Sequence, residues 1–258
     1  MPELINLEGK TAVIFGLANK RSIAWGIALK LRDAGAKLAI CYQNERMKSE
    51  AQGLIDDLPE AEGFQCDVSS DDEITALFGT LKERYGKIDV LVHAVAFAPA
   101  ADMHGDFIDT SREGFRIAHD VSVYSLIAVS RAVAPLMIEG GSVITLTYFG
   151  AEKVVPHYNV MGVAKASLEA TVRYLANSLG GQKIRVNAIS AGPIKTLAAR
   201  GVGALGDMLK AHADKSPLHR NVDQAEVGGA AAFLASDLSG AITGETIYVD
   251  CGYNIMGF

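Results

Sequence analysis

The sequence predicts one α/β domain, residues 1–258, in which a doubly wound sheet of about seven parallel strands carries helices on both faces. Three observations support this fold class. Short apolar runs alternate with longer segments of helical periodicity along the whole chain. These runs are apolar almost throughout, which is typical of strands buried on both faces. No linker or internal repeat divides the chain, so right-handed crossovers within one sheet are expected.

The predicted elements follow one another in a regular order. Strands are predicted over residues 10–15, 37–42, 63–66, 88–93, 142–146, 183–190 and 246–249. Helices are predicted over residues 23–35, a stretch ending at 58, 71–85, 112–119, 121–137, a long segment ending at 179, and 226–235. Glycines 201, 203 and 206 interrupt the segment 197–216, which is therefore predicted to open and close over a ligand as a lid.

Composition and charge exclude several classes of function. The formal net charge is −6 and no cluster of Lys and Arg is present, which argues against nucleic-acid binding. No apolar run approaches the ~20 residues that span a bilayer, and the N-terminus lacks the pattern of a secretion signal. The three cysteines and six histidines show no metal-ligand spacing. The sequence therefore indicates a cytoplasmic protein with reduced thiols, no metal and no membrane partner.

The first predicted strand ends at a turn that fits a pyrophosphate group. Gly16 breaks the strand, and Ser22 is a good N-cap for the helix that begins at Ile23. Backbone N–H groups and the positive end of the helix dipole would face an anion there. The spacing departs from the usual G-x-G-x-x-G, so a plain turn and cap without a ligand is the alternative interpretation.

The next three strand ends carry candidates for contacts with the nucleotide. Gln43 is neutral and can bind a ribose hydroxyl, while Glu45 disfavours a 2′-phosphate and Arg46 favours one, so NADH is preferred over NADPH. Asp67 either accepts from an adenine amino group or begins a helix cap with the two serines after it. The small residues 94–98 leave room for a cofactor, and Phe97 is either a wall for substrate or a core aromatic.

Tyr158 and Lys165 carry the predicted chemistry. Lys165 lies seven residues after Tyr158, about two helical turns, so both side chains can share one helix face. An ammonium beside the phenol would lower its pKa from about 10 and make the hydroxyl a better proton donor. Such pairs are common on amphipathic helices, so the pair alone does not indicate catalysis, and the rest of the chain must support that interpretation.

Several stretches together resemble one branch of the short-chain dehydrogenase/reductases, the NADH-dependent enoyl-[acyl-carrier-protein] reductases. They are GLANKRSIAWGIA, CYQNER, QCDV, VHAVAFAP, EGFRIAHDVSVYS, YNVMGVAKASLEA, RVNAISAGPIKTLAA and FLASDLSGAITGE, and the similarity covers roughly residues 7–249. Ordinary members of the wider family carry Tyr-x3-Lys, whereas the enoyl reductases carry Tyr-x6-Lys. Here Met161 occupies the ordinary tyrosine position and Tyr148 the ordinary serine position.

The resemblance implies a fold, an activity and a set of site residues. It implies a Rossmann-type domain that passes hydride from NADH to the β-carbon of a trans-2-enoyl thioester on acyl carrier protein, in a homotetramer. Tyr158, Lys165 and Tyr148 would be catalytic. The implied cofactor contacts are Gly16, Ser22, Ile23, Gln43, Asp67, Val68, Ala96, Lys165, Ile194 and Thr196. The implied substrate contacts are Phe97, Ala98, Tyr148, Tyr158, Met161 and Leu205.

Two departures and two alternatives accompany this resemblance. Cys251 stands where the family often has a glycine, and Leu205 where some members have an aromatic residue. A reductase of 3-ketoacyl or other carbonyl substrates would need a tyrosine at position 161. A nucleotide-sensing module without catalysis would need neither Tyr158 nor Lys165. Because the carrier is acidic, docking would need a basic patch, for which Lys195, Arg200 and Lys210 are the candidates.

Overall fold

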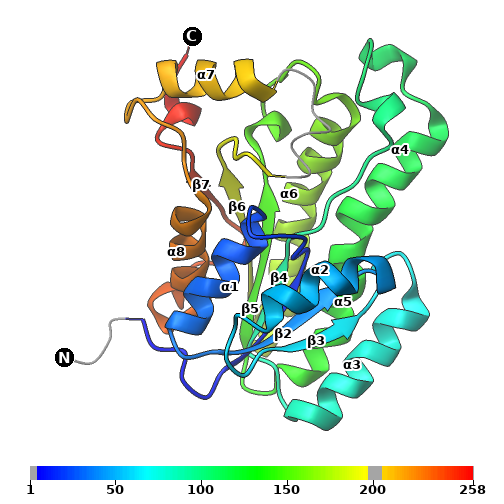
Figure 1. The fold of residues 1–258 in the computed structure, drawn as a ribbon, viewed down its shortest axis with the longest axis vertical. Coiled ribbons are helices and arrows are strands. Elements are labelled where there is room, and N and C mark those ends of the chain that lie inside the picture. Colours follow the sequence, from blue (N-terminus) through cyan, green and yellow to red (C-terminus); the bar gives the residue numbers. More distant parts are fainter. Residues whose placement is uncertain (1–4, 197–204, 258) are drawn as a thin grey trace.

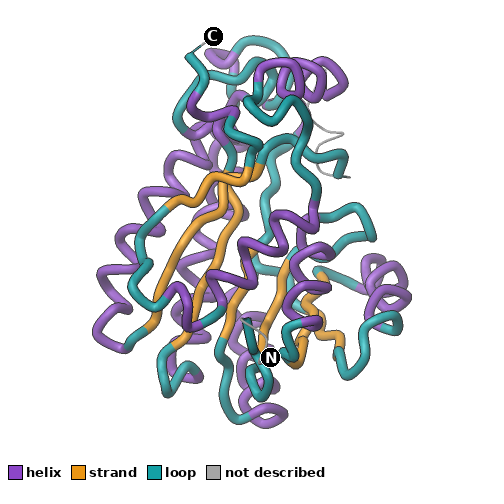
Figure 2. Tube along the Cα trace, turned by 90° about the vertical axis from the view of Figure 1, so that its left-hand side faces the viewer, coloured by secondary structure: helices purple, strands orange, loops and turns teal. Residues whose placement is uncertain are grey.

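The computed structural model describes residues 5–196 and 205–257, and its centre is one parallel sheet (Figures 1 and 2). Seven strands lie in the order β3-β2-β1-β4-β5-β6-β7, and every neighbouring pair is parallel. Their bounds are β1 Thr11–Phe15, β2 Lys37–Tyr42, β3 Glu62–Gln65, β4 Val90–His93, β5 Gly141–Thr147, β6 Ile184–Ala191 and β7 Thr246–Val249. The predicted fold class and all seven strand positions are confirmed.

Eight α-helices in the described residues cover the sheet. They are α1 Ile23–Asp33, α2 Glu45–Ile55, α3 Asp71–Tyr85, α4 Arg112–His119, α5 Ser125–Val133, α6 Asn159–Leu179, α7 Leu205–Lys215 and α8 Gln224–Ala235. Residues 205–215, predicted as part of an irregular lid, form the helix α7, and residues 197–204 of that segment lie outside the described residues.

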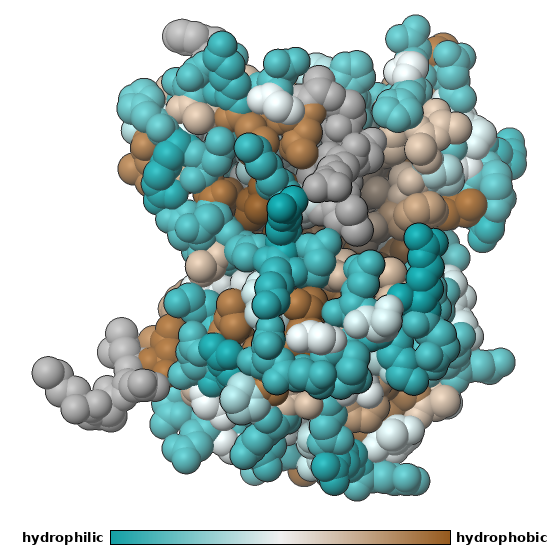
Figure 3. Space-filling view, in the orientation of Figure 1, coloured by the Kyte–Doolittle hydropathy of each residue, from teal (hydrophilic) through white to brown (hydrophobic). Residues whose placement is uncertain are grey.

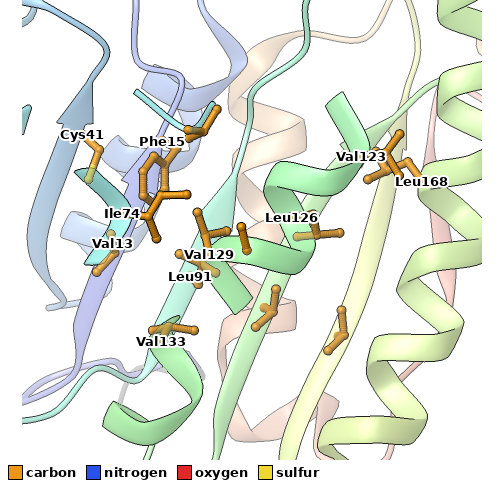
Figure 4. Packing of buried hydrophobic residues seen from close by; sticks show 14 of the residues in the cluster. Val13, Phe15, Cys41, Ile74, Leu91, Val123, Leu126, Val129, Val133 and Leu168 are labelled. Carbon is orange, nitrogen blue, oxygen red and sulfur yellow. The ribbon is translucent and has the colours of Figure 1, made fainter. Parts of the chain in front are cut away.

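Alternate residues of the central strands face two separate apolar layers. Val13 and Phe15 of β1 pack with α3, α5 and α6, as Figure 4 shows for part of this layer, whereas Ala12 and Ile14 pack with α1, α2 and α8. This alternation follows from the two-residue period of a strand. All five residues of β1 are buried, which explains why the strand reads as a continuous apolar run. The doubly wound arrangement therefore buries both faces of the sheet.

Polar caps set where several helices begin. The hydroxyl of Ser22 accepts a hydrogen bond from the amide of Trp25, and the side chains of Asn44, Ser70 and Ser111 act in the same way on their helices. Asp223 forms a full capping box at the start of α8. These caps lie in the connections between strands, so they fix where each helix starts relative to the sheet.

The helices predicted over 112–119 and 121–137 are joined through a π turn, Asp120–Tyr124, into one helical stretch. By length and composition alone, the joined stretch, Arg112–Leu136, is long and apolar enough to cross a bilayer. Half of its apolar window is nevertheless buried inside the protein, and Leu126 and Val129 are fully buried in the apolar layer of Figure 4. Its position is that of a core helix.

The carboxyl ends of the strands point toward the part of the molecule that carries α7 (Figure 1). The imidazole of His212 on α7 lies beside Gly192, just after β6, and stacks on Tyr253 with ring centroids 4.7 Å apart. On the face shown in Figure 3, polar residues predominate, and apolar residues appear in several separate groups. Ligands of doubly wound sheets bind at this edge, so the candidate site is sought there.

Candidate active site

Two tyrosine rings meet where β5 ends and α6 begins. The rings of Tyr148 and Tyr158 are edge to face, with centroids 5.0 Å apart and an interplanar angle of 75°. Helix α6 starts at Asn159, so Tyr158 is its N-cap residue and not, as predicted, a residue within the helix. Gly150 makes room for both rings, because a Cβ atom there would lie 2.5 Å from Cδ1 of Tyr158 and 3.3 Å from Cδ1 of Tyr148.

The backbone on either side of Tyr158 adopts an uncommon conformation. His157 has φ +64° and Asn159 has φ +33°, values that residues with a Cβ atom adopt rarely. The side-chain amide of Asn159 donates to the carbonyl oxygen of Gly105 at 3.1 Å, which ties the start of α6 to the loop after β4. Such outliers concentrate at functional sites, where the surrounding structure holds them in place.

Lys165 is buried, with 5% of its surface exposed, and its Nζ donates to the carbonyl oxygen of Leu146 at 2.8 Å. Burial lowers the pKa of Lys165 to about 8, and the charge of Glu169 opposes this shift. Burial and then the neighbouring Tyr148 raise the pKa of Tyr158. The expectation that Lys165 lowers the pKa of this phenol is therefore wrong, because burial dominates and the ammonium is bonded to β5.

His93, the last residue of β4, is buried near enough to Lys165 to be affected by its charge. Its Nδ1 is 3.1 Å from the hydroxyl of Thr145, and its Nε2 is 2.7 Å from the hydroxyl of Ser125. Burial and then the charge of Lys165 lower the pKa of His93 to about 3. The imidazole is consequently neutral, and it joins β4 to β5 and α5 beneath the site.

The turn after β1 fits the pyrophosphate of a dinucleotide. Gly16 has φ +92°, and a Cβ atom there would lie 2.1 Å from the carbonyl oxygen of Ala94, so only glycine fits between β1 and β4. Ser22 caps α1, whose first turn contains no acidic residue, whereas the first turn of α3 contains three. The positive end of the α1 dipole is thus left for an anion.

Gln43 and Asp67 meet at the ends of β2 and β3. The Gln43 amide donates to Oδ2 of Asp67 at 2.9 Å, and Oδ1 of Asp67 accepts from the backbone and the hydroxyl of Ser69. Burial works to raise the pKa of Asp67, but the hydrogen bonds from Ser69 and Gln43 outweigh it and the pKa is lowered. Asp67 therefore carries a negative charge beside Gln43. Asp67 also begins the helix cap given as the alternative, since it holds Ser69 next to Ser70, whose hydroxyl caps α3.

The candidate substrate residues fall into two groups. Phe97 and Met161 lie on either side of Ser122, whose hydroxyl accepts a hydrogen bond from the amide of Phe97 at 3.1 Å and lies 3.9 Å from the sulfur of Met161. Ala98 packs against the same apolar layer as Tyr158. Leu205 instead lines a cavity of about 180 Å³, together with Arg21, Lys195, Thr196, Gly206 and Leu209. Half of the Phe97 surface is exposed, 54%, so Phe97 is not a core aromatic.

The remaining candidates also lie at the carboxyl edge of the sheet. Ile23 opens α1, Val68 is buried after β3, Ala96 is exposed after β4, and Ile194 packs on the layer that contains α1 and α8. Arg200, one of the three basic docking candidates, lies outside the described residues. Within the described ranges, no group of three or more His, Cys, Asp and Glu side chains is placed to hold a metal ion.

The sequence reasoning missed Gly150, Ser122, His93, Thr147 and Glu169. Only Glu169 had a local signal, because it follows Lys165 by four residues and therefore shares its helix face. Ser122, His93 and Thr147 contact the site through partners far away in the chain; His93 and Thr145, for example, are 52 residues apart. Gly150 is close to both tyrosines in the chain, but its contact with their rings follows only from the fold.

Fold and site together define a class of protein. A turn that fits pyrophosphate, followed across the sheet by a tyrosine and a buried lysine, is the arrangement of a dinucleotide-dependent oxidoreductase of the short-chain dehydrogenase/reductase type. The family profile described as Enoyl-(Acyl carrier protein) reductase matches residues 16–254, and the chain belongs to this family.

Relatives and solved structures agree with this membership over nearly the whole chain. The enoyl-[acyl-carrier-protein] reductase [NADH] FabI of Bacillus cereus is 53% identical, over 97% of this chain and 99% of its own. A Staphylococcus aureus relative named for NADPH is also 53% identical, with the same coverage. The Bacillus cereus crystal structure with NADP+ and indole naphthyridinone has a TM-score of 0.96, 53% identity, and coverage of 98% and 99%. The Anaplasma phagocytophilum enzyme with NAD has a TM-score of 0.95, 47% identity, and coverage of 98% and 96%.

Proposed function

We propose that this chain reduces the carbon–carbon double bond of trans-2-enoyl thioesters carried on acyl carrier protein, during fatty-acid elongation. The observation that carries this proposal is the position of Tyr158 seven residues before Lys165, with Met161 between them in the chain. Met161 is buried, 6% exposed, and its thioether cannot donate a proton. A carbonyl reductase of the same class would need its proton donor at that position. The Bacillus cereus and Staphylococcus aureus relatives are named for the same activity.

Tyr158 is proposed as the donor to the thioester oxygen. When hydride reaches the β-carbon, negative charge gathers on that oxygen as an enolate, and a hydroxyl aimed at it stabilises the charge. Because the pKa of Tyr158 is raised, its hydroxyl keeps its proton and acts as a hydrogen-bond donor. Tyr148 orients the ring of Tyr158 and lines the acyl pocket.

A bound nicotinamide dinucleotide would supply the hydride. Lys165 is proposed to hold its ribose hydroxyls, and the turn after Gly16 with the start of α1 to hold its pyrophosphate. The other proposed contacts are Ser22, Ile23, Gln43, Asp67, Val68, Ala96, Ile194 and Thr196, which lie along one edge of the sheet.

NADH is the proposed reductant, although relatives are named for NADH and for NADPH. The ribose end of the site holds the neutral Gln43, whose amide is bonded to the ionised Asp67. A 2′-phosphate there would meet the negative charge of Asp67, which opposes the favourable charge of Arg46, whereas a hydroxyl can bond to Gln43 or to Asp67. We expect kcat/KM to be higher with NADH than with NADPH. The variant Gln43→Arg should lower the ratio of kcat/KM for NADH to kcat/KM for NADPH. A wild-type preference for NADPH would contradict this.

Exposed aromatic residues and buried thiols support proposals for the assembly and the location. We propose a homotetramer, since Phe115 and Tyr124 on the joined helix and Tyr174 on α6 are exposed at 42%, 41% and 80%. Cys41 and Cys66 are buried free thiols, which fits a cytoplasmic protein. Light scattering of the purified protein tests the assembly, and a monomer would refute it.

One assay separates the candidate activities. Loss of NADH absorbance is followed with a crotonyl thioester, with a 3-ketoacyl thioester and with neither. We expect turnover only with the crotonyl thioester. Turnover only with the ketoacyl thioester would establish the carbonyl reductase instead, and NADH binding without turnover of either would establish a sensing module.

A further inference from the structure

Two consecutive residues at the end of β5 are held by two side chains from consecutive turns of α6. Lys165 donates to the carbonyl oxygen of Leu146 at 2.8 Å, and Oε1 of Glu169 accepts from the hydroxyl of Thr147 at 2.7 Å. Glu169 and Thr147 are buried, 9% and 4% exposed. The next residue is Tyr148, whose ring meets that of Tyr158. The two bonds therefore fix where β5 delivers Tyr148 relative to the start of α6.

Glu169 is the nearest acidic residue on the helix face of Lys165, because residues four apart lie one above the other. A buried ammonium loses the solvation that favours its charge, and a carboxylate close by in a medium of low polarity restores part of it. The charge of Glu169 acts on Lys165 in this direction. Lys165 and Glu169 are thus coupled in charge, although each takes its own hydrogen-bond partner on β5.

We propose that Glu169 is a positioning residue for this site, holding Thr147 at the end of β5 and keeping Lys165 in its ammonium form. This inference rests on the proposed role of Lys165. A carboxylate that only held the strand would need no charge, since a neutral amide oxygen accepts a hydroxyl proton equally well in geometry. The charge is therefore the part of the side chain to test.

Other groups act on this pair from the surrounding elements. His93 on β4 is neutral, and the charge of Lys165 contributes to the lowering of its pKa. Glu152 after β5 and Arg173 on α6 act on Glu169 with opposite signs, and Tyr248 on β7 is hydrogen-bonded to Glu152. Burial raises the pKa of Glu169, against the hydrogen bond from Thr147 and the charges of Arg173 and Lys165. None of these neighbours changes in the variants used below.

Three variants separate charge from position. Glu169→Gln keeps an acceptor for Thr147 and removes the charge, Thr147→Val removes the hydroxyl and keeps the carboxylate, and Thr147→Ser restores the hydroxyl. Glu83→Gln is the matched control, since it makes the same charge change at an exposed position on α3. Each is measured for the pH profile of kcat/KM, for the pH dependence of the NADH dissociation constant by fluorescence, and for Tm.

In Glu169→Gln, we expect the alkaline limb of both profiles to move to lower pH by about one unit, the size typical for loss of a nearby opposite charge. Thr147→Val should leave the limb in place and lower kcat by roughly two- to tenfold, the value of one hydrogen bond; Thr147→Ser should recover it. Glu83→Gln should match the wild type.

An alkaline limb that Glu169→Gln leaves unmoved, in a variant with a near-wild-type Tm, overturns the proposal. Lys165→Met distinguishes this failure from failure of the site itself. If Lys165→Met turns over like the wild type, the proposed role of Lys165 is wrong; if it is inactive while Glu169→Gln titrates like the wild type, only the inference about Glu169 is wrong. If Glu169→Gln does not fold, Glu169→Asp is measured instead. Aspartate keeps the negative charge, so the alkaline limb should stay near that of the wild type, and a limb moved to lower pH by about one unit in this variant counts against the proposal.

Discussion

Tyr148 presents its ring edge-on to Tyr158, with the two ring centroids 5.0 Å apart, although the first follows a strand and the second caps a helix. Gly150 lies beside both rings and allows this contact, because it has no side chain to separate them. The position of the Tyr158 hydroxyl therefore depends on three residues within one short segment of the chain.

Removing the Tyr158 hydroxyl tests its role directly. Tyr158→Phe should lower kcat by ~10²–10⁴, the range for loss of a positioned proton donor, because the ring contact survives and only the donor is lost. Tyr148→Phe should cost less than roughly tenfold. Tyr85→Phe, at the last residue of α3 and outside the candidate site, is the control. Equal effects of Tyr148→Phe and Tyr158→Phe would mean that the donor has been misassigned.

Adding one methyl group beside the rings should displace Tyr158. A Cβ atom at residue 150 would lie 2.5 Å from Cδ1 of Tyr158, and a misplacement near 1 Å in a reactive group can cost ~10²-fold in rate. Gly150→Ala is therefore expected to lower kcat strongly. Gly79→Ala on α3, where nothing lies within 4 Å of the added Cβ, should keep full activity and raise stability by about 0.5–1 kcal/mol. Wild-type kinetics in Gly150→Ala would contradict the packing described.

Cys251 occupies a backbone conformation suited to glycine. Its φ is +58°, in the left-handed region, which costs a residue with a Cβ atom about 1 kcal/mol. Cys251→Gly should therefore raise the free energy of unfolding by roughly that amount, measured by urea denaturation. Cys251→Ala retains the Cβ atom and should give no gain. A loss of stability in the glycine variant would show that the thiol contributes more than the backbone costs.

The stability of the protein should rise with pH through the titration of Lys165. The pKa of Lys165 is lowered to about 8 in the folded protein, while an exposed lysine titrates near about 10.4. Between these values the unfolded chain binds the proton and the folded chain does not, so unfolding becomes less favourable as pH rises. The wild type should gain up to about 3 kcal/mol relative to Lys165→Met between pH 8 and 10.4. A difference independent of pH would contradict this titration.

The strand positions could be predicted because burial on both faces leaves a local signature. Residues 11–15 are all buried, and such runs are apolar whatever their partners are. The join between α4 and α5 could not be predicted, since a π turn depends on how the helix packs against α6 and the sheet. Likewise, Tyr158 fell one residue outside the helix that its spacing to Lys165 suggested.

The candidate residues of the site could be predicted by resemblance, but their electrostatics could not. The pair Tyr158 and Lys165 suggested an ammonium beside a phenol, whereas the side chain of Lys165 reaches the carbonyl oxygen of Leu146. Nothing in the sequence specifies whether the flexible side chain of Lys165 reaches the hydroxyl of Tyr158 or the carbonyl oxygen of Leu146. The bond from Gln43 to Asp67 joins residues 24 apart, and only the pairing of β2 with β3 makes them neighbours.

The parallel sheet assembles the site from loops that follow each of the strands β1 to β6, so its pieces are scattered from Gly16 to Thr196. A fragment that lacks any one of these strands lacks part of the proposed dinucleotide and substrate contacts. Recovery of turnover after dilution from denaturant should therefore report the joining of the strands β1 to β6.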